Sequence, residues 1–477
     1  MTWMKRSSTS LLLAASILLS SAPLSVSAQP TLLVQVRHDS EPLYDGRSRL
    51  RAARFPNGEV LTTQVAIAPG RHRVSLVRYG ADGREISRIE AAPESARGSA
   101  PFVVGEQLGQ VVALPDGSAL VAGMSGTVLE TDEIVLPFVF RIDRSGRALW
   151  RLTGRSTADP RRFFAGFGIT LGDQGELFIA GMFTEGSFGL PGAPMWRPRR
   201  QNNPFIARVD LDTGRVIWAK RTPRDGYLVV QGGVLQLISS DVPRTRHGDR
   251  APAFSTLRVW RYDVSGRRLG RSRDRIPGAS APRAGAAPLP GGGFAVVTET
   301  CRRQDAAGRC LTEGIVYVYD ARGNRVATHA VPAWSVLAHP TPGAPLRVIG
   351  PTALRRVSVG GSSRIVTDEV EVLTFTDPTQ PPTRARIAVP NTRFTSVVDA
   401  VRFGGQSLPG GVLFHSPSAL LEPGTQDRGV PGDTVIFVPD ANFRPVPSLP
   451  NVPSDPYPPA PPPAPRDDNP RVLNPFG

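Results

Sequence analysis

The sequence predicts an all-β protein, a seven-bladed β-propeller of four-stranded antiparallel blades, and three observations support this. Turns containing glycine recur about every 59 residues, seven copies of an aspartate-containing hairpin follow them, and long apolar stretches with the 3.6-residue helical period are absent. Self-similarity at a period of this length is typical of solenoids, propellers and other arrays. Four short strands per period, joined by tight turns, favour the propeller.

The glycine turns set the period. They fall at 57–58, 116–117, 174–175, 232–233, 291–292 and 410–411, and the glycines at 58, 117, 175, 233 and 292 are 59, 58, 58 and 59 residues apart. The step from Gly292 to Gly410 is 118 residues, which is two periods, and Gly350 stands near its midpoint. We therefore expect the turn of the missing repeat near Gly350.

The stretch 108–150 shows how one period divides into strands. Residues 110–114 and 119–123 are short apolar segments on either side of a Pro-Asp-Gly turn, 138–143 reads as a third strand, and 148–150 begins a fourth. The third strand and its turn recur seven times, at 77–83, 138–146, 206–214, 259–266, 316–323, 373–377 and 436–440. The aspartate of this turn can accept from the backbone amide two residues on, and the glycine then takes positive φ. These aspartates are predicted to be structural.

The first residues are typical of an export signal. Lys5 and Arg6 precede an apolar run at 11–19, and small residues lead to Ala28. This pattern predicts a signal peptide over 1–28 and an exported protein, periplasmic or extracellular at the cell surface. The alternative is an anchor that is left uncut. No later segment is long and apolar enough for a transmembrane helix.

The remaining domain boundaries follow from strand patterning and composition. Residues 29–44 contain the strand-like segment 31–37, which we expect to close the ring as the outer strand of the last blade. The propeller is expected over 45–445. Residues 446–477 are rich in proline, which cannot donate backbone hydrogen bonds, so a disordered tail is predicted there. The tail is either a solvated spacer or a docking or wall-associating segment.

The charge is strongly positive, with a net value of +15, and almost all of it comes from arginine. A basic exported protein is attracted to anionic surfaces such as lipopolysaccharide, acidic glycans or extracellular nucleic acid. No pattern for specific nucleic-acid readout accompanies the charge. A GC-rich genome would produce the same arginine bias without any such partner.

The chain has two cysteines, Cys301 and Cys310. An isolated, closely spaced pair in an oxidising compartment predicts a disulfide that closes a hairpin loop. The spacing differs from C-x-x-C and no histidine lies nearby, which disfavours a redox or metal role.

One segment carries a family resemblance. Asp210-Leu211-Asp212-Thr213-Gly214-Arg215-Val216-Ile217-Trp218 resembles the tryptophan-docking motif of pyrroloquinoline-quinone (PQQ)-type propellers, and 143–150 is similar but one residue shorter. The turn and hairpin pattern is also similar to bacterial sixty-residue propeller repeats. The resemblance implies that Asp210, Thr213, Gly214 and Trp218 pack blades together. Quinone dehydrogenases of this kind carry adjacent cysteines, which are absent, so no cofactor is expected.

A binding surface is predicted on one face of the ring. The loops between second and third strands and the connections between blades share this face, and several are long and rich in arginine. The expected binding residues are Trp196, Arg197, Arg199, Arg200, Arg244, Arg246, His247, Arg250, Arg302, Arg303 and Arg162. A solvated loop surface is the alternative reading.

Catalytic motifs are sparse. The six histidines show no metal-ligand spacing, and no nucleophile elbow or phosphate loop stands out. We therefore expect no catalytic or metal site and a non-enzymatic binding or scaffold protein of the cell envelope, with an envelope protein, an anionic glycan or lipopolysaccharide as partner. The alternatives are a glycan lyase or hydrolase with its site in the axial cavity, and a quinone-dependent oxidoreductase.

Overall fold

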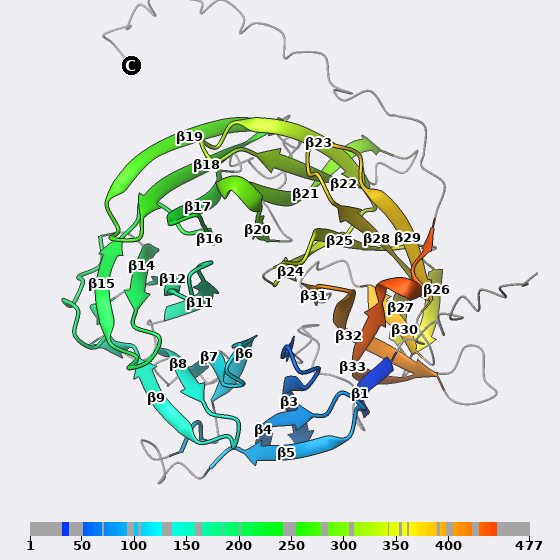
Figure 1. Cartoon of the computed structure of the whole chain (residues 1–477), viewed down its shortest axis with the longest axis horizontal. Helices are drawn as coiled ribbons and strands as arrows, with labels where there is room; N and C mark the ends of the chain where they lie inside the picture. The colour runs from blue at the N-terminus through cyan, green and yellow to red at the C-terminus, as the bar shows by residue number, and fades with distance from the viewer. Residues whose placement is uncertain are drawn as a thin grey trace, which may run out of the picture.

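The structure is a computed structural model of the chain in which strands stand as blades around a central axis (Figure 1). It describes residues 31–37, 51–68, 71–92, 100–103, 106–125, 136–157, 165–184, 186–199, 202–241, 254–277, 285–304, 310–341, 343–352, 355–359, 362–388, 392–396, 404–421 and 429–445. At some strand ends only the backbone is described. The described part forms seven antiparallel blades of four strands, as the sequence predicts.

In blades 1 to 6 the four strands follow one another along the chain, from the axis to the rim. Blade 1 holds β2 (Arg51–Arg54), β3 (Val60–Ala68), β4 (Arg71–Tyr79) and β5 (Glu85–Glu90), and blade 2 holds β6 (Gln107–Ala113), β7 (Ala119–Ser125), β8 (Leu136–Ile142) and β9 (Ala148–Thr153). Blade 3 holds β11 (Ala165–Leu171), β12 (Leu177–Phe183), β14 (Asn203–Val209) and β15 (Val216–Arg221), and blade 4 holds β16 (Tyr227–Gln231), β17 (Val234–Asp241), β18 (Phe254–Asp263) and β19 (Arg268–Pro277). Blade 5 holds β20 (Ala286–Pro288), β21 (Phe294–Gln304), β22 (Cys310–Tyr319) and β23 (Arg325–Val331), and blade 6 holds β24 (Val336–Pro340), β25 (Leu346–Pro351), β28 (Glu369–Phe375) and β29 (Thr383–Ala388).

Both ends of the propeller sequence meet in the seventh blade. Its inner strands are β31 (Gly404–Leu408), β32 (Gly411–Leu421) and β33 (Gly429–Pro439). The N-terminal β1 (Thr31–Arg37) pairs antiparallel with β33 and forms the outer strand, as expected from the sequence. The short β34 (Arg444–Pro445) pairs instead with β29 at the rim of blade 6. The ring is therefore closed by strands from opposite ends of the sequence.

The aspartate turns have the expected geometry with one variation. In the turns of blades 3 and 5 the aspartate accepts from the amide two residues on, as Asp320 does from Arg322 at 2.8 Å. Asp143 and Asp263 accept instead from the amide four residues on, at 3.0 and 2.9 Å. The glycines of these turns have positive φ. These carboxylates are occupied by their own turns.

The sixth repeat differs from the expectation. Gly350 lies inside the buried strand β25, and the glycine of positive φ in the first turn of blade 6 is Gly343. The prediction that Gly350 marks this turn is therefore wrong. A Cβ on Gly350 would lie 2.4 Å from the Ser335 hydroxyl oxygen, so the glycine is explained by close packing of a strand.

Blades 6 and 7 carry additions that the period does not predict. A hairpin of β26 (Arg355–Val359) and β27 (Ser362–Thr367) stands between β25 and β28, and β27 pairs with β30 (Thr392–Ser396), which pairs with β32. The inner strands β24 and β31 also pair in parallel, with His339 opposite Gln406. These two blades are thus joined by backbone pairing as well as by side chains.

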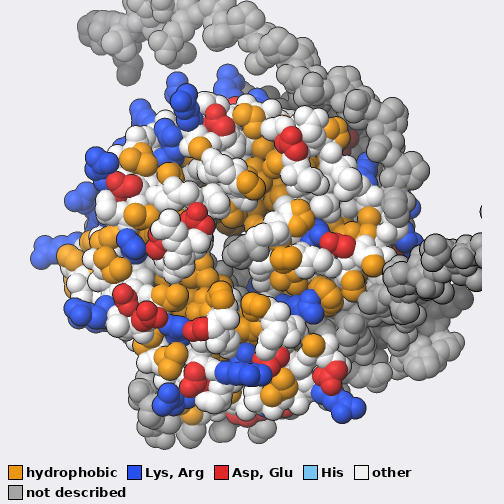
Figure 2. All heavy atoms as spheres, in the orientation of Figure 1, with side chains coloured by type: hydrophobic (Ala, Val, Ile, Leu, Met, Phe, Trp, Pro, Cys, Tyr) orange, Lys and Arg blue, Asp and Glu red, His pale blue; other side chains and the backbone are white. Residues whose placement is uncertain are grey.

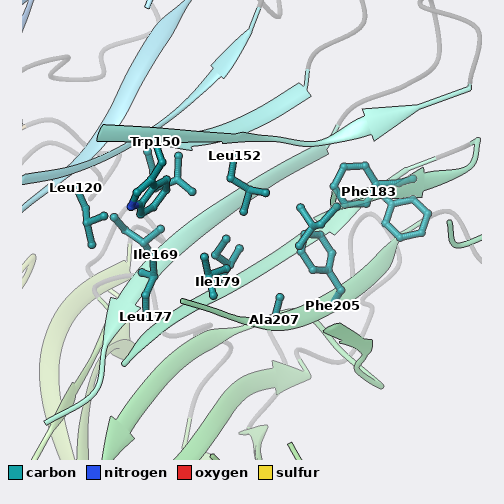
Figure 3. Packing of buried hydrophobic residues seen from close by; sticks show 14 of the residues in the cluster. Leu120, Trp150, Leu152, Ile169, Leu177, Ile179, Phe183, Phe205 and Ala207 are labelled. Carbon is teal, nitrogen blue, oxygen red and sulfur yellow. The ribbon is translucent and has the colours of Figure 1, made fainter. Parts of the chain in front are cut away.

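The apolar core lies largely between neighbouring blades. One cluster joins Trp150 and Leu152 of blade 2 to Ile169, Leu177 and Phe205 of blade 3 (Figure 3). The blade therefore cannot bury its faces alone, and stacking around the axis completes the core.

A tryptophan at the rim fixes each of two blade joints. Trp150 donates its indole N–H to the Leu211 carbonyl at 2.8 Å, and Trp218 donates to the Val264 carbonyl at 2.9 Å. Gly214 has φ +70°, and a Cβ there would lie 2.6 Å from the Trp150 ring, so glycine gives the ring its place. At the joint of blades 5 and 6, the His329 ring nitrogen takes this role against the Pro378 carbonyl at 2.9 Å.

Arginines of the third strands cross the same joints. In each of blades 1 to 4, the arginine two or three positions before the turn donates to a carbonyl in the next blade. The pairs are Arg78 to Gly117 (3.0 Å) and Arg144 (3.2 Å), Arg141 to Leu211 (3.1 Å), Arg208 to Val264 (3.4 Å) and Arg261 to Ala321 (3.3 Å). We call these four donors the joint arginines. They satisfy turn carbonyls and so belong to the fold.

Candidate functional site

The connection between β12 and β14 folds back onto blade 3. In it β13 (Phe188–Gly189) pairs with β10 (Arg155–Ser156), and the backbones of Phe188 and Trp196 exchange two hydrogen bonds of 2.9 and 2.6 Å. Topology places this connection at the end of the blade opposite the aspartate turns. We call its described residues the blade 3 strap.

Aromatic rings form the base of the strap. The Trp196 ring lies 5.4 Å from Phe205 and stacks on Phe183 at 6.3 Å, and Phe188 lies 5.2 Å from both Phe183 and Phe205, measured between centroids. Phe183 and Phe205 belong to the buried cluster shown in Figure 3. Aromatic pairs at these distances stabilise beyond their buried area. The strap is therefore seated on the rigid core of blade 3.

Asn203 fixes the end of the strap that carries charge. It is 4% exposed, and its side-chain oxygen accepts from the Arg199 amide at 2.7 Å. Its side-chain nitrogen donates to the Thr184 carbonyl at 3.2 Å. One amide side chain thus holds both ends of the connection together.

Three arginines lie at this end of the strap: Arg197, Arg199 and Arg221. Arg221, the last residue of β15, donates to the Arg197 carbonyl and lies 5.8 Å from the Phe183 ring centroid, within cation–π range. Burial, and then the positive charge of Arg199, lower the pKa of Arg221. Arg197 and Arg199 are exposed. Among the described residues, no carboxylate forms an ion pair with any of the three.

This arrangement is suited to an anion. Arginine presents a planar fork of donors that matches carboxylate, sulfate or phosphate oxygens. Like charges held together without a counter-charge repel one another, and an anion between them would relieve that repulsion. We call Arg197, Arg199 and Arg221 the strap arginines.

Only some of the binding residues predicted from the sequence lie together in the structure. Arg197 and Arg199 lie together at the strap, and Trp196 lies beneath them as a half-buried packing residue. Arg302 and Arg303 lie on β21, where only the backbone is described. The others lie outside the described residues: Arg162, Arg200, Arg244, Arg246, His247 and Arg250.

Cys301 and Cys310 lie on the paired strands β21 and β22, with Cys301 opposite Thr312 and Cys310 opposite Gln304. Their side chains lie outside the described residues, so the disulfide stays a prediction.

Arg221 is the site residue that the sequence reasoning missed. It ends an outer strand, whereas the search considered loops. Its signal in the sequence is weak, because the neighbouring Lys220 belongs to the blade joint and donates to the Gly266 carbonyl. Only the tertiary fold brings the end of β15 beside the strap.

In the part of the chain that the structure describes, no three His, Cys, Asp or Glu side chains are grouped so as to hold a metal ion. The same part contains no helix of the length and apolarity that a membrane crossing requires.

His415 makes the fold sensitive to acid. Burial, and then the charge of Arg51, lower the pKa of this imidazole from its ordinary value of 6.5 to about 3, and its Nδ1 has no hydrogen-bond partner among the described residues. Because the unfolded chain takes up the proton first, stability is full above pH 6.5 and falls as the pH drops towards 3. At pH 5 the expected loss from this group is about 2 kcal/mol.

Thermal unfolding of the parent and of His415→Phe at pH 7 and pH 5 measures how much of the acid-induced loss of stability comes from His415. The parent should lose more stability on acidification than the variant, which has no imidazole to protonate. Equal losses in the two proteins would show that His415 does not carry the effect.

Comparison with known proteins gives a likeness of fold. No protein-family profile and no curated protein sequence matches the chain. Among solved structures, the chain is similar to the polysaccharide lyase Uly1, with 9% identity, TM-score 0.46, and coverage of 84% of this chain and 91% of the lyase. It is also similar to an α-L-arabinofuranosidase from Fusarium graminearum (12% identity, TM-score 0.39, coverage 85% and 98%) and to Drosophila Semaphorin 1b (10%, 0.37, 87% and 88%). These values assign no activity.

Proposed function

We propose that the protein is an exported, non-enzymatic binding propeller that holds an anionic group of a cell-envelope partner on the loop face of blade 3. The observation that supports this is the cluster of strap arginines, which has no carboxylate counter-charge among the described residues. The partner's chemistry is a carboxylate, sulfate or phosphate group, as on an acidic glycan, lipopolysaccharide or an acidic envelope protein. Export to the periplasm or cell surface is part of the proposal and follows from the signal-like N-terminus.

The rigidity of the base supports a binding role. Arginine side chains lose conformational freedom when they bind, and a preorganised site reduces that cost. Here the Arg221 side chain is already held by the Arg197 carbonyl, and the backbone that carries Arg199 is held by its amide contact with Asn203. The site can therefore bind an anion with little rearrangement.

The test is a titration of the mature chain with a trisaccharide-sized fragment of dextran sulfate. The double variant Arg197→Ala/Arg199→Ala removes two charge-assisted donors, each worth about 1.5–3 kcal/mol, so affinity should fall at least about tenfold. A matched control, Arg84→Ala/Arg322→Ala, removes the same charge from exposed turns at the other end of the blades. It should bind nearly as the parent does.

Two outcomes would contradict the proposal. One is equal weakening in the strap variant and the control, because binding would then follow net charge alone. The other is unchanged affinity in the strap variant. Unfolding curves of all proteins serve as the check on folding, since exposed surface changes are expected to shift stability by less than about 0.5 kcal/mol.

A further inference from the structure

The outer strand of blade 4 carries a row of exposed arginines. Side chains alternate along a strand, so Leu269, Arg271, Arg273 and Arg275 of β19 lie on one face, and all four are exposed. Figure 2 shows Lys and Arg side chains along the upper left rim, where Figure 1 places β19. We call Arg271, Arg273 and Arg275 the blade 4 ladder.

The acidic residue of this strand is turned away from the ladder. Asp274 lies on the opposite face, where its carboxylate accepts from the Tyr319 hydroxyl at 2.9 Å and pairs with Arg325 of blade 5 at 3.3 Å. On the ladder's own face, Arg258 lies opposite Arg273 and pairs with Asp241 at 2.5 Å. The nearby carboxylates are therefore engaged elsewhere.

Three arginines on other outer strands are neutralised by carboxylates. Arg88 pairs with Glu85 at 2.7 Å and Arg151 with Glu106 at 2.6 Å, and Arg384 of β29 pairs with Glu371. For Arg271 and Arg273, the described part of the chain offers no ion-pair partner. Arg271 and Arg273 thus differ from these three paired arginines.

The spacing of the ladder suits a linear polymer. Alternate residues of a strand are about 6.7 Å apart, so the three arginine side chains start from evenly spaced positions along roughly 13 Å of strand. A stiff chain with regularly repeated anionic groups can contact such a row along its length. A single small anion would use only one position.

The surroundings disfavour nucleic acid as the ligand. Single-stranded nucleic acid is bound by basic surfaces that also offer aromatic rings for base stacking. The aromatic side chains beside the ladder, Trp260 and Tyr262, are only 6% and 4% exposed. The ladder therefore offers charge without stacking.

We propose that the blade 4 ladder binds a linear acidic polysaccharide along the rim of the propeller. The anionic oxygens of the polymer belong to carboxylates or sulfates, and both accept hydrogen bonds from guanidinium groups. This site uses none of the strap arginines and goes beyond the function proposed for blade 3. It would give the protein a second, elongated contact with the same kind of surface.

The experiment measures affinity of the mature chain for polygalacturonate and dextran sulfate, each as a long polymer and as a trisaccharide-sized fragment. The triple variant Arg271→Ala/Arg273→Ala/Arg275→Ala should weaken the long polymers at least tenfold and the fragments far less. The control Arg84→Ala/Arg215→Ala/Arg322→Ala removes three exposed turn charges. If the triple variant folds poorly, the affinity of the single variant Arg273→Glu for the same polymers tests the ladder instead.

The two polymers identify the anionic group, since a ladder-dependent loss with polygalacturonate alone assigns carboxylates and with dextran sulfate alone assigns sulfates. Unchanged affinity for both polymers in the ladder variants would overturn the proposal. Equal, ladder-dependent binding of single-stranded oligothymidylate would overturn the choice of polysaccharide. A loss of polymer affinity in the strap variant Arg197→Ala/Arg199→Ala alone would support the function proposed for blade 3 and contradict binding at the ladder.

Discussion

Replacing Trp150 with alanine is expected to lower the free energy of unfolding by about 4 kcal/mol, within the roughly 3–5 kcal/mol range for a buried tryptophan. The ring is 9% exposed and fills the joint between blades 2 and 3. Its loss leaves a cavity above Gly214 and removes the N–H that satisfies the Leu211 carbonyl. Denaturant-induced unfolding of parent and variant measures the difference.

Trp150→Phe separates the contribution of ring packing from that of the indole hydrogen bond. It keeps an aromatic ring in the joint and loses only the 2.8 Å hydrogen bond and part of the volume, so it should cost less than the alanine variant. If Trp150→Ala unfolds at the same denaturant concentration as the parent, the joint does not contribute to stability as argued.

Replacing Arg347 with alanine is the second large effect, with an expected loss of about 3 kcal/mol. Arg347 is 2% exposed and joins blade 6 to blade 7. Its guanidinium donates to the carbonyls of Leu408 and Gly411 at 2.8 and 2.6 Å and to both oxygens of Asp440 at 2.8 and 2.9 Å. Removing it leaves these acceptors without their donor beside the blade that closes the ring.

The matched control is Arg147→Ala. Arg147 also pairs with an aspartate, Asp143 at 3.3 Å, but its side chain is 77% exposed. An exposed pair of this kind is worth about 0–1 kcal/mol. Equal effects of the two substitutions in denaturant unfolding would contradict the role given to Arg347.

Much of the fold could be predicted because its signals are local in the sequence. A turn needs its aspartate and glycine within a few residues, and the closing role of 31–37 follows from a strand without a partner at one end and prolines at the other. The prediction of a turn at Gly350 failed because a glycine required by packing looks the same in sequence as a glycine required by a turn. The hairpin of β26 and β27 could not be predicted, because it is not part of the 59-residue repeat.

The site was harder to predict because arginine has two uses in this chain. The joint arginines reach carbonyls about a repeat away, for example Arg141 to Leu211, and this contact depends on how blades stack. The strap arginines combine the loop residues Arg197 and Arg199 with a strand residue, Arg221. The amino-acid composition does not distinguish the joint arginines from the strap arginines.

Amide hydrogen exchange with and without dextran sulfate tests directly whether the loop face of blade 3 holds an anionic group. Exchange is expected to slow at 194–199 and 219–224 when the polyanion is present. Little change is expected at the aspartate turns 143–147 and 320–324, at the other end of the blades. Protection confined to those turns, or no protection at the strap, would show that blade 3 does not hold the anion there.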